Sequence, residues 1–353
     1  MLKNEKDLLT FPARRSDSYL LKTWKKVTPP KPDNDVSFQA GASDLFVPKS
    51  ISSPPDKVKS FSIATWNVEN MFLKVPEDIP GKKQILFNYI KNSFHNITEF
   101  FNTTASKTPI KPEKQLLAVA KGLKSINADI VAIQEANDME DLDTFQKKYM
   151  GKDSYPYSVL IEGNDGRGID VGILSKYPIM KAYTHRDYSF NIPQKKEKGF
   201  FSRDLLEAII KITPQYEIKI FVTHAKSQLG GEAADRKREG EAQAANTIIN
   251  KHLTLEPNMP TFLAADLNDK PDSPSLKILC GPNGQLRDPL EKEGKQNEPT
   301  HHNKKFGDTK LDYILVSPVT MKQYQQKSST IYHTKTMHEA SDHDPIKETY
   351  IPD

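Results

Sequence analysis

Short apolar runs recur along this 353-residue chain, and several of them end in a residue type that catalysis uses. The runs are FSIATWNVE (61–69), ADIVAIQE (128–135), EIKIFVTHA (217–225), PTFLAADLN (260–268), KLDYILVS (310–317) and, near the carboxyl end, ASDHDPI (340–346). Most of them read as buried strands. Because an unpaired polar group in a core is costly, we expect the polar strand ends to converge on one solvent-filled mouth.

The residues at these strand ends are carboxylates, amides and imidazoles. They are Asn67, Glu69, Glu135, His224, Asp266, Asn268, Asp342 and His343. In a strand, residues two apart point to the same face. Alternation therefore pairs Asn67 with Glu69, and Asp266 with Asn268.

The remaining segments indicate a layered α/β fold. Further strands are expected at 171–175 and 205–212, and amphipathic helices at 114–126 and 232–252. No internal repeat appears at a fixed period. Strands outnumber helices, which favours packed sheets with helices outside them.

The first sixty residues differ in texture from the rest of the chain. They contain clusters of proline, serine and lysine without a sustained apolar period, so we expect residues 1–60 to form a disordered or draped extension and 61–353 the catalytic domain. Residues 1–60 carry 11 Lys and Arg against 7 Asp and Glu, so the net charge of +4 comes from this segment. Bulk charge therefore does not by itself indicate nucleic-acid binding.

Several classes of protein are not supported by the sequence. No run approaches the roughly 20 apolar residues of a membrane-spanning helix, and the first thirty residues are too charged for a signal-peptide core. We therefore expect a cytoplasmic protein, or a secreted one if an export signal lies outside this sequence. Cys280 is alone, which excludes an intrachain disulfide but is neutral about compartment.

The ordered motifs WNVEN, IQE, GILSKYPI, VTHAKS, ADLN, LDYIL and SDHDPI together resemble the endonuclease/exonuclease/phosphatase superfamily over about residues 61–351. These metal-dependent phosphohydrolases include deoxyribonucleases of the pancreatic type, abasic-site endonucleases, inositol-polyphosphate phosphatases and bacterial sphingomyelinases. The resemblance implies a four-layer α/β (α+β) sandwich, in which two packed mixed sheets are flanked by helices.

The resemblance also implies a metal site. Glu135, in the QE motif, matches a glutamate that ligates catalytic Mg²⁺, with Mn²⁺ able to substitute. Asn67 lies beside it in the family, Glu69 matches a position that is often acidic, and Asp342 is expected near the metal. Mg²⁺ keeps several waters, so one or two carboxylates suffice.

The same comparison assigns catalytic roles. His343 is expected to pair with Asp312, while Asp266 and Asn268 match the motif that positions water and phosphate. His224 matches a histidine that contacts phosphate in all these branches except the abasic-site branch. Both Asp266 and the His343–Asp312 pair are candidates for the general base.

Two cations are assigned to substrate phosphate, namely Arg203 by the resemblance and Lys226 by its place two residues after His224.

Several other residues are expected to have structural roles and no part in catalysis. Asp170 is more consistent with a loop acid than with a partner of His224, and the segment 236–241 with a solvated helix face. His301 and His302 are expected to be loop residues without metal. Trp66 is expected in the core, and Tyr313 behind Asp312.

Two departures from the family pattern stand out. Ala265 replaces the glycine that usually precedes the D-x-N motif. An insertion at 76–112, with apolar residues at helical spacing, lengthens the connection after the first strand; we expect it near the mouth, as a lid or a substrate selector.

The leading hypothesis is an Mg²⁺-dependent phosphodiesterase, and more specifically a monomeric nuclease with nucleic acid as substrate. WNVENMF, HAKSQLGG and the spacing of Arg238, Ala242 and Ala244 are similar to bacterial DNase-like members. The alternative is a sphingomyelinase-like enzyme or an inositol or lipid phosphate hydrolase; it calls for an exposed aromatic hairpin, for which 188–201 is the nearest candidate. A non-catalytic binding protein on this fold would be expected to lack the ligands that are present here.

Overall fold

Two mixed β-sheets packed face to face form the centre of the molecule, which we describe from a computed structural model covering residues 18–28, 35–73, 110–151, 154–305 and 307–353. The first sheet runs in the order β1 (Trp24–Val27), β2 (Asp44–Pro48), β7 (Ile179–Thr184), β10 (Leu206–Thr213), β11 (Tyr216–His224), β12 (Thr261–Asp266) and β13 (Asp312–Val316). The second runs β14 (Thr330–Ile331), β15 (Ile346–Tyr350), β3 (Phe61–Met71), β4 (Ile130–Ala136), β6 (Asp170–Ser175) and β5 (Tyr157–Leu160). A separate hairpin pairs β8 (Phe190–Asn191) with β9 (Lys198–Gly199).

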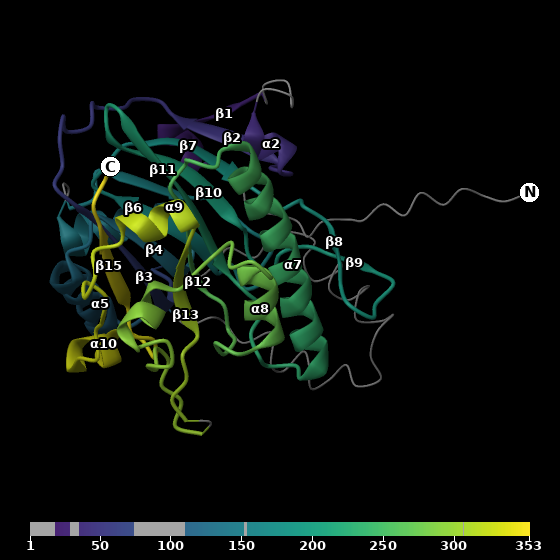
Figure 1. The fold of residues 1–353 in the computed structure, drawn as a ribbon. Coiled ribbons are helices and arrows are strands. Elements are labelled where there is room, and N and C mark those ends of the chain that lie inside the picture. Colours follow the sequence, from purple (N-terminus) through teal and green to yellow (C-terminus); the bar gives the residue numbers. More distant parts are fainter. Residues whose placement is uncertain (1–17, 29–34, 74–109, 152–153, 306) are drawn as a thin grey trace, which may run out of the picture.

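Helices cover the outer faces of both sheets, as Figure 1 shows. The two long helices are α5 (Glu113–Ile126), which packs on the second sheet, and α7 (Glu232–Leu255), which packs on the first. The shorter ones are α1 (Leu20–Thr23), α2 (Val36–Gln39), α6 (Met139–Phe145), the π-helix η2 (Gln146–Met150), α8 (Pro274–Cys280), the 3₁₀-helix η3 (Pro289–Glu293), α9 (Pro318–Gln323) and α10 (Lys335–Ala340). The four-layer sandwich expected from the sequence is confirmed.

Strand alternation divides the core into two parts. On β11, the side chains of Ile218, Ile220 and Val222 face the second sheet, whereas Phe221 packs toward α7. On β3, Phe61 contacts Phe262 of the opposite sheet, with ring centroids 6.2 Å apart. The same alternation places the polar residues at the strand ends in the space between the sheets.

The amino-terminal segment contributes to the first sheet. β1 pairs with β2, and β2 pairs with β7 of the main body. These two strands lie before the domain boundary expected at Phe61, yet they are part of the first sheet. The expected insertion at 76–112 lies almost wholly outside the described residues.

The helices and strands expected from the sequence lie within a few residues of the observed ones. The segments 114–126 and 232–252 correspond to α5 and α7, and 171–175 and 205–212 to β6 and β10. Trp66 is fully buried, as expected. Among the described residues, none of the helices combines the length and the apolar character needed to cross a bilayer.

Candidate active site

The parallel strands β11 and β12 deliver the first two polar side chains of the site together. Their register sets His224 directly beside Asp266, and the antiparallel pairing of β12 with β13 sets Asp266 beside Asp312. The opposite sheet contributes Asn67 from β3, whose amide nitrogen donates to Asp266 Oδ2 over 2.9 Å. Residues from two sheets therefore meet at one edge of the sandwich.

Asp266 lies at the centre of this group. Its Oδ2 is 3.3 Å from His224 Nε2 and 3.8 Å from His343 Nε2. Burial, reinforced by Asp312, raises the pKa of the Asp266 carboxyl to about 6 even though His343 opposes the shift. The site thus holds a carboxylate that takes up a proton unusually readily.

Glu135 joins the same group through an irregular piece of backbone. Its Oε1 accepts from Asn67 Nδ2 at 3.2 Å and lies 3.9 Å from His224 Nε2. Its backbone is left-handed, with φ of 66°, at a break in the pairing of β4 with β6. The bulge turns the Glu135 side chain toward Asn67. Regular alternation along β4 would point it to the other face of the sheet.

The two pairs predicted by alternation, Asn67 with Glu69 and Asp266 with Asn268, lie together. The contact in each pair joins a backbone N–H to a side chain and not two side chains. Glu69 donates its backbone N–H to Asn67 Oδ1, and Asn268 donates its own to Asp266 Oδ1. Both Glu69 and Asn268 have positive φ, so neither continues a regular strand. Asn268 also donates from its side chain to the Ala225 carbonyl over 3.2 Å.

His343 and Asp312 form the ion pair predicted from the sequence. His343 Nδ1 is 2.8 Å from Asp312 Oδ2, and that oxygen also accepts from the Thr300 hydroxyl. Burial lowers the pKa of His343, but Asp312 and Asp266 outweigh it and raise the pKa to about 10. The imidazole is therefore cationic at neutral pH, with Nε2 directed toward Asp266.

His224 is neutral by contrast. Burial, together with Arg203 and the cationic His343, lowers its pKa well below the ordinary value. Asp170 does not orient it, because that carboxylate accepts from the Gly163 backbone N–H, and among the described residues no hydrogen-bond partner meets His224 Nδ1. A neutral imidazole can donate a hydrogen bond from its single N–H, but it carries no second proton that it could give up.

Acidic side chains line the open side of the site. Glu69 and Asp342 are partly exposed, and the pKa of Glu69 is raised by burial and by the nearby carboxylates of Asp342 and Glu135. A buried lysine that the sequence analysis missed, Lys111, donates to the Glu69 carbonyl over 2.7 Å. Carboxylates in this proximity favour a bound divalent cation, so the donor set suits the expected metal.

The two cations assigned to phosphate lie in different environments. Arg203 is buried; it donates to the Ala225 carbonyl and lies 3.1 Å from Asp165 Oδ2. The guanidinium is thus held by two protein groups, and the phosphate contact expected of Arg203 stays a prediction. Lys226 is partly exposed, and burial and Arg203 lower its pKa.

Arg167 is a cation that the sequence analysis did not select. It lies in the GNDGRGID loop, pairs with Asp165 at 3.2 Å and keeps 55% of its side chain exposed. Its charge acts on both Glu135 and His224. A lone loop arginine carries no periodic signal, so only the fold reveals this proximity.

The helix face expected to be solvated is in part buried. Arg238 and Glu241 of α7 are each 4% exposed. Glu241 accepts from the backbone N–H groups of Ser202 and Lys226, and Arg238 pairs with Asp269. This prediction was wrong because α7 holds the loops beside the site with charged rather than apolar side chains.

The two adjacent loop histidines face different clusters. His301 Nε2 is 3.5 Å from Asp342 Oδ2, and its ring lies 4.6 Å from that of His343. His302 Nε2 instead lies 2.6 Å from Asp344 Oδ2. Both were expected to be loop residues without metal, yet each belongs to a group of side chains with the geometry to hold an ion.

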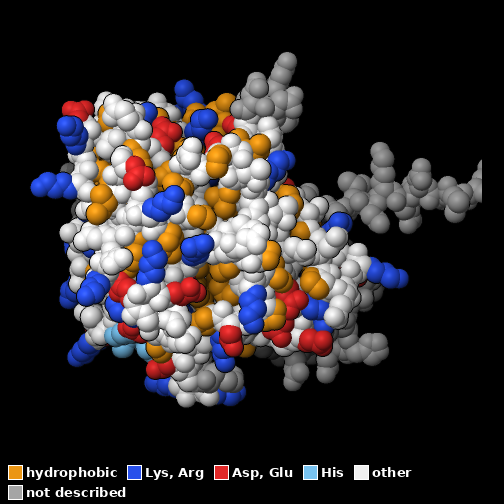
Figure 2. All heavy atoms as spheres, viewed as in Figure 1, with side chains coloured by type: hydrophobic (Ala, Val, Ile, Leu, Met, Phe, Trp, Pro, Cys, Tyr) orange, Lys and Arg blue, Asp and Glu red, His pale blue; other side chains and the backbone are white. Residues whose placement is uncertain are grey.

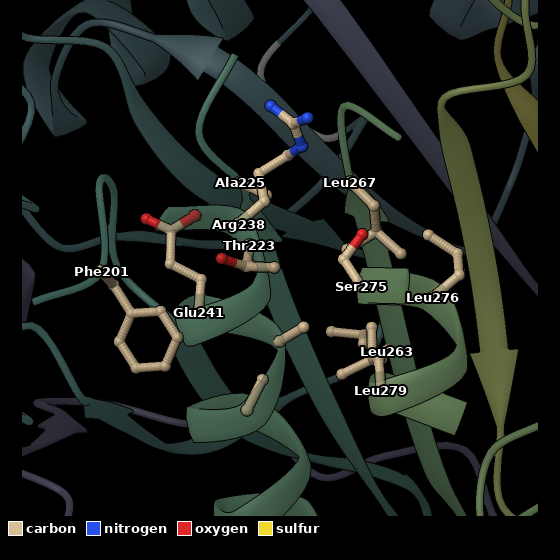
Figure 3. Close-up of a pocket in the computed structure, with 12 residues that line it drawn as sticks. Phe201, Thr223, Ala225, Arg238, Glu241, Leu263, Leu267, Ser275, Leu276 and Leu279 are labelled. Carbon is tan, nitrogen blue, oxygen red and sulfur yellow. The ribbon is translucent and has the colours of Figure 1, made fainter. Parts of the chain in front are cut away.

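A separate apolar pocket lies behind the site, between α7, α8 and β12 (Figure 3). Its lining includes Thr223, Ala225 and Leu267, whose side chains alternate with those of His224 and Asp266. The pocket therefore belongs to the opposite face of the sheet. Tyr313 is buried on this same face, behind Asp312 as expected.

Comparison with known proteins agrees with the fold and the motifs. A family model described as the endonuclease/exonuclease/phosphatase family matches residues 64–343. By sequence, the chain matches none of the curated proteins.

Solved structures show the same architecture at low identity. The human Nocturnin catalytic domain with bound sulfate is 14% identical with a TM-score of 0.55, covering 85% of this chain and 97% of that one. Truncated TDP2 from Caenorhabditis elegans is 15% identical with a TM-score of 0.51, covering 83% and 98%. An endonuclease/exonuclease/phosphatase from Beutenbergia cavernae is 13% identical with a TM-score of 0.52, covering 84% and 72%.

The family match spans most of the chain, and it covers the strands that carry Asn67, Glu135 and Asp266 as well as the segment that carries His343. Members of this family are in general metal-dependent phosphoester and phosphodiester hydrolases. The chain belongs to the endonuclease/exonuclease/phosphatase family.

Proposed function

We propose that this protein is a divalent-metal-dependent phosphodiester hydrolase and that its substrate is nucleic acid. The observation that carries the proposal is the convergence on Asp266, whose Oδ2 lies 2.9 Å from Asn67 Nδ2, 3.3 Å from His224 Nε2 and 3.8 Å from His343 Nε2. Groups of this kind at this spacing can hold a water and a phosphate between them.

Glu135 is the proposed principal ligand of Mg²⁺ or Mn²⁺, with Asn67, Glu69 and Asp342 around it. Asn67 fixes Glu135 Oε1, and the Asn70 backbone N–H donates to Oε2 over 2.9 Å. When bound, the cation neutralises charge on the phosphate oxygens. The buried Lys111 lies beside Glu69 and offsets part of the negative charge there.

The pKa shifts favour different roles for the two candidate bases, which are Asp266 and the His343–Asp312 pair. His343 is held protonated by Asp312, so it serves as a cationic donor to a phosphate oxygen and not as a base. Asp266, whose pKa is about 6, accepts the proton of the attacking water. Asn268 holds Asp266 through its backbone N–H.

His224, neutral at physiological pH, donates a hydrogen bond from Nε2 to phosphate. The cations beside it, Lys226 and Arg167, face outward and suit the flanking phosphates of a polyanionic chain. Arg203 is a positioning residue, since it grips the Ala225 carbonyl next to His224.

The hairpin at 188–201 bears on the choice between nucleic acid and lipid. Phe190 and Phe201 are buried, with ring centroids 5.4 Å apart, and Phe190 packs against α7. The large apolar side chains that are exposed among the described residues are all aliphatic. An aromatic membrane-entry hairpin, which the sphingomyelinase-like alternative calls for, is thus not found in the part of the chain that the structure describes.

Incubation with plasmid DNA, RNA, sphingomyelin and an inositol polyphosphate, each with Mg²⁺ or with a chelator, tests the proposal. We expect cleavage of nucleic acid that the chelator abolishes. Turnover of the lipid or inositol substrate alone would replace the nuclease with the alternative hydrolase. Inactivity on all four, with intact fold, would favour a binding protein.

A further inference from the structure

Three imidazoles surround the carboxylate of Asp344, one residue after His343. Asp344 is fully buried, and its Oδ2 lies 2.6 Å from both His302 Nε2 and His333 Nδ1. Its Oδ1 lies 3.2 Å from His338 Nε2. This oxygen accepts no hydrogen bond from any described residue. Figure 2 shows histidine side chains, in pale blue, reaching the surface in the area where Figure 1 places α10.

The outer nitrogens of two of these rings also meet carboxylates. His302 Nδ1 lies 3.2 Å from Asp308 Oδ2, and His333 Nε2 lies 3.0 Å from Glu298 Oε1. A carboxylate can only accept, so both rings would have to be doubly protonated if hydrogen bonds alone held the cluster. The His302 and His333 rings, with centroids 6.0 Å apart, would then be two neighbouring cations.

A bound metal ion removes this conflict. The inner nitrogens would present lone pairs to the ion, and the outer N–H groups would donate to Asp308 and Glu298. Histidine ligands of metals are held in this way by carboxylates on the far side of the ring. The His302 and His333 rings are then neutral, and each of their nitrogens has a suitable partner.

The spacing and the ligand types indicate which class of ion fits. One ligand atom each from His302, His338 and Asp344 lie within 4.8 Å of one another. Imidazole and carboxylate ligands at about 2.0–2.2 Å from an ion give tetrahedral zinc sites. A set rich in imidazole favours Zn²⁺, Co²⁺ or Ni²⁺ over Mg²⁺, which prefers oxygen.

We propose that His302, His338 and Asp344, with His333 as fourth ligand, bind a zinc-type divalent ion at a site separate from the one at Glu135. The ion would join the loop after His301, the turn at His333, α10 and the segment that carries His343. That segment is already tied to the loop, because Asp344 N donates to the Thr300 carbonyl and His302 N donates to the Asp342 carbonyl. The proposal does not depend on the reaction that the family site performs.

Co²⁺ titration of the full-length, metal-stripped protein tests the site, because tetrahedral Co²⁺ absorbs visible light. We expect a visible band that saturates at one ion per chain. In His338→Ala, which removes a half-exposed ring, we expect Co²⁺ affinity to fall at least a hundredfold, with an unchanged circular dichroism spectrum. His333→Ala should weaken binding by a smaller factor.

Two variants control for the neighbouring sites. Glu135→Gln and His301→Ala alter the other groups of ligands and should leave the band and the affinity unchanged. The proposal is overturned if His338→Ala binds Co²⁺ as the wild type does, or if Glu135→Gln or His301→Ala abolishes the band. Zinc in the purified protein, measured by mass spectrometry and lost in His338→Ala, would support it independently.

Discussion

Two buried groups of ionisable side chains in this molecule differ in how their charge is balanced. Beneath α7, Glu207 is fully buried and lies within 3.3 Å of Lys219, His252 and His185. The charges there are matched, and the group is enclosed. In the candidate active site, five carboxylates lie around two cations, His343 and Lys111, and part of the group is open to solvent; the acids are Glu69, Glu135, Asp266, Asp312 and Asp342.

The pKa values of Glu207 and Asp266 are shifted in opposite directions. Burial would raise the pKa of Glu207, but His252 and Lys219 hold it well below its ordinary value. The pKa of Asp266, in contrast, is raised to about 6. The ionised form of Glu207 therefore stabilises the fold, whereas the ionised form of Asp266 destabilises it and favours a cation from outside.

His343→Ala should show the largest effect. Removing the cationic donor next to Asp266 should lower kcat for Mg²⁺-dependent cleavage by on the order of 10³-fold, within the range for loss of a donor that stabilises charge in the transition state. Circular dichroism should show an intact fold. Glu207→Gln, which lies outside the site, is the control, and equal activity of the two variants would contradict the assignment.

Glu207→Gln should instead act on stability. Removing one partner of a buried ion network should cost about 3 kcal/mol in the free energy of unfolding, measured by urea denaturation. Because the folded-state pKa is depressed, the stabilisation is present above the unfolded pKa near 4.5 and is lost as pH falls below it. A variant as stable as the wild type at pH 7 would show that the network is not stabilising.

Asp266→Asn should have the opposite sign in the metal-free protein. The folded-state pKa exceeds the unfolded one, so stability falls as pH rises from about 4 to about 6. Replacing the carboxylate should then raise the free energy of unfolding at pH 7 by roughly 3 kcal/mol, and the gain should vanish near pH 4. Destabilisation at pH 7 would refute the charge imbalance, while cleavage activity should be lost in either case.

Arg167→Ala should have the smallest effect. An exposed cation that meets a flanking phosphate should raise KM for DNA about fivefold with little change in kcat, equivalent to about 1 kcal/mol. The dependence of KM on salt should also weaken. Lys147→Ala, which removes an exposed lysine on η2 paired with Asp143, is a matched control and should leave both unchanged.

The sequence predicted the parts of the site that regular strands deliver. His224 and Asp266 follow from apolar runs that end in polar residues, and the strand register then brings them together; Asp312, beside Asp266 in that register, was expected from the family resemblance. Glu135 also ends an apolar run, but its orientation depends on a bulge that alternation does not predict.

The rest depends on contacts between distant segments. Lys111 and Arg167 are single cations without periodic signal, and only the fold brings them near Glu135. Arg203 was assigned to phosphate by the resemblance, and Arg238 was expected on a solvated helix face; both are buried beside the site. Among the histidines around Asp344, His333 and His338 are 11 and 6 residues away from it in sequence, but His302 is 42 residues away, which local spacing does not connect.

Mn²⁺ binding, measured by electron paramagnetic resonance, addresses the contrast between the two clusters most directly. In a His338→Ala background, which removes the histidine cluster, the protein should bind one Mn²⁺ per chain. Adding Glu135→Gln should abolish this binding, whereas adding Glu207→Gln should not. Retention of Mn²⁺ in the Glu135→Gln protein, or its loss in the Glu207→Gln protein, would show that the unmatched carboxylates do not form the cation site.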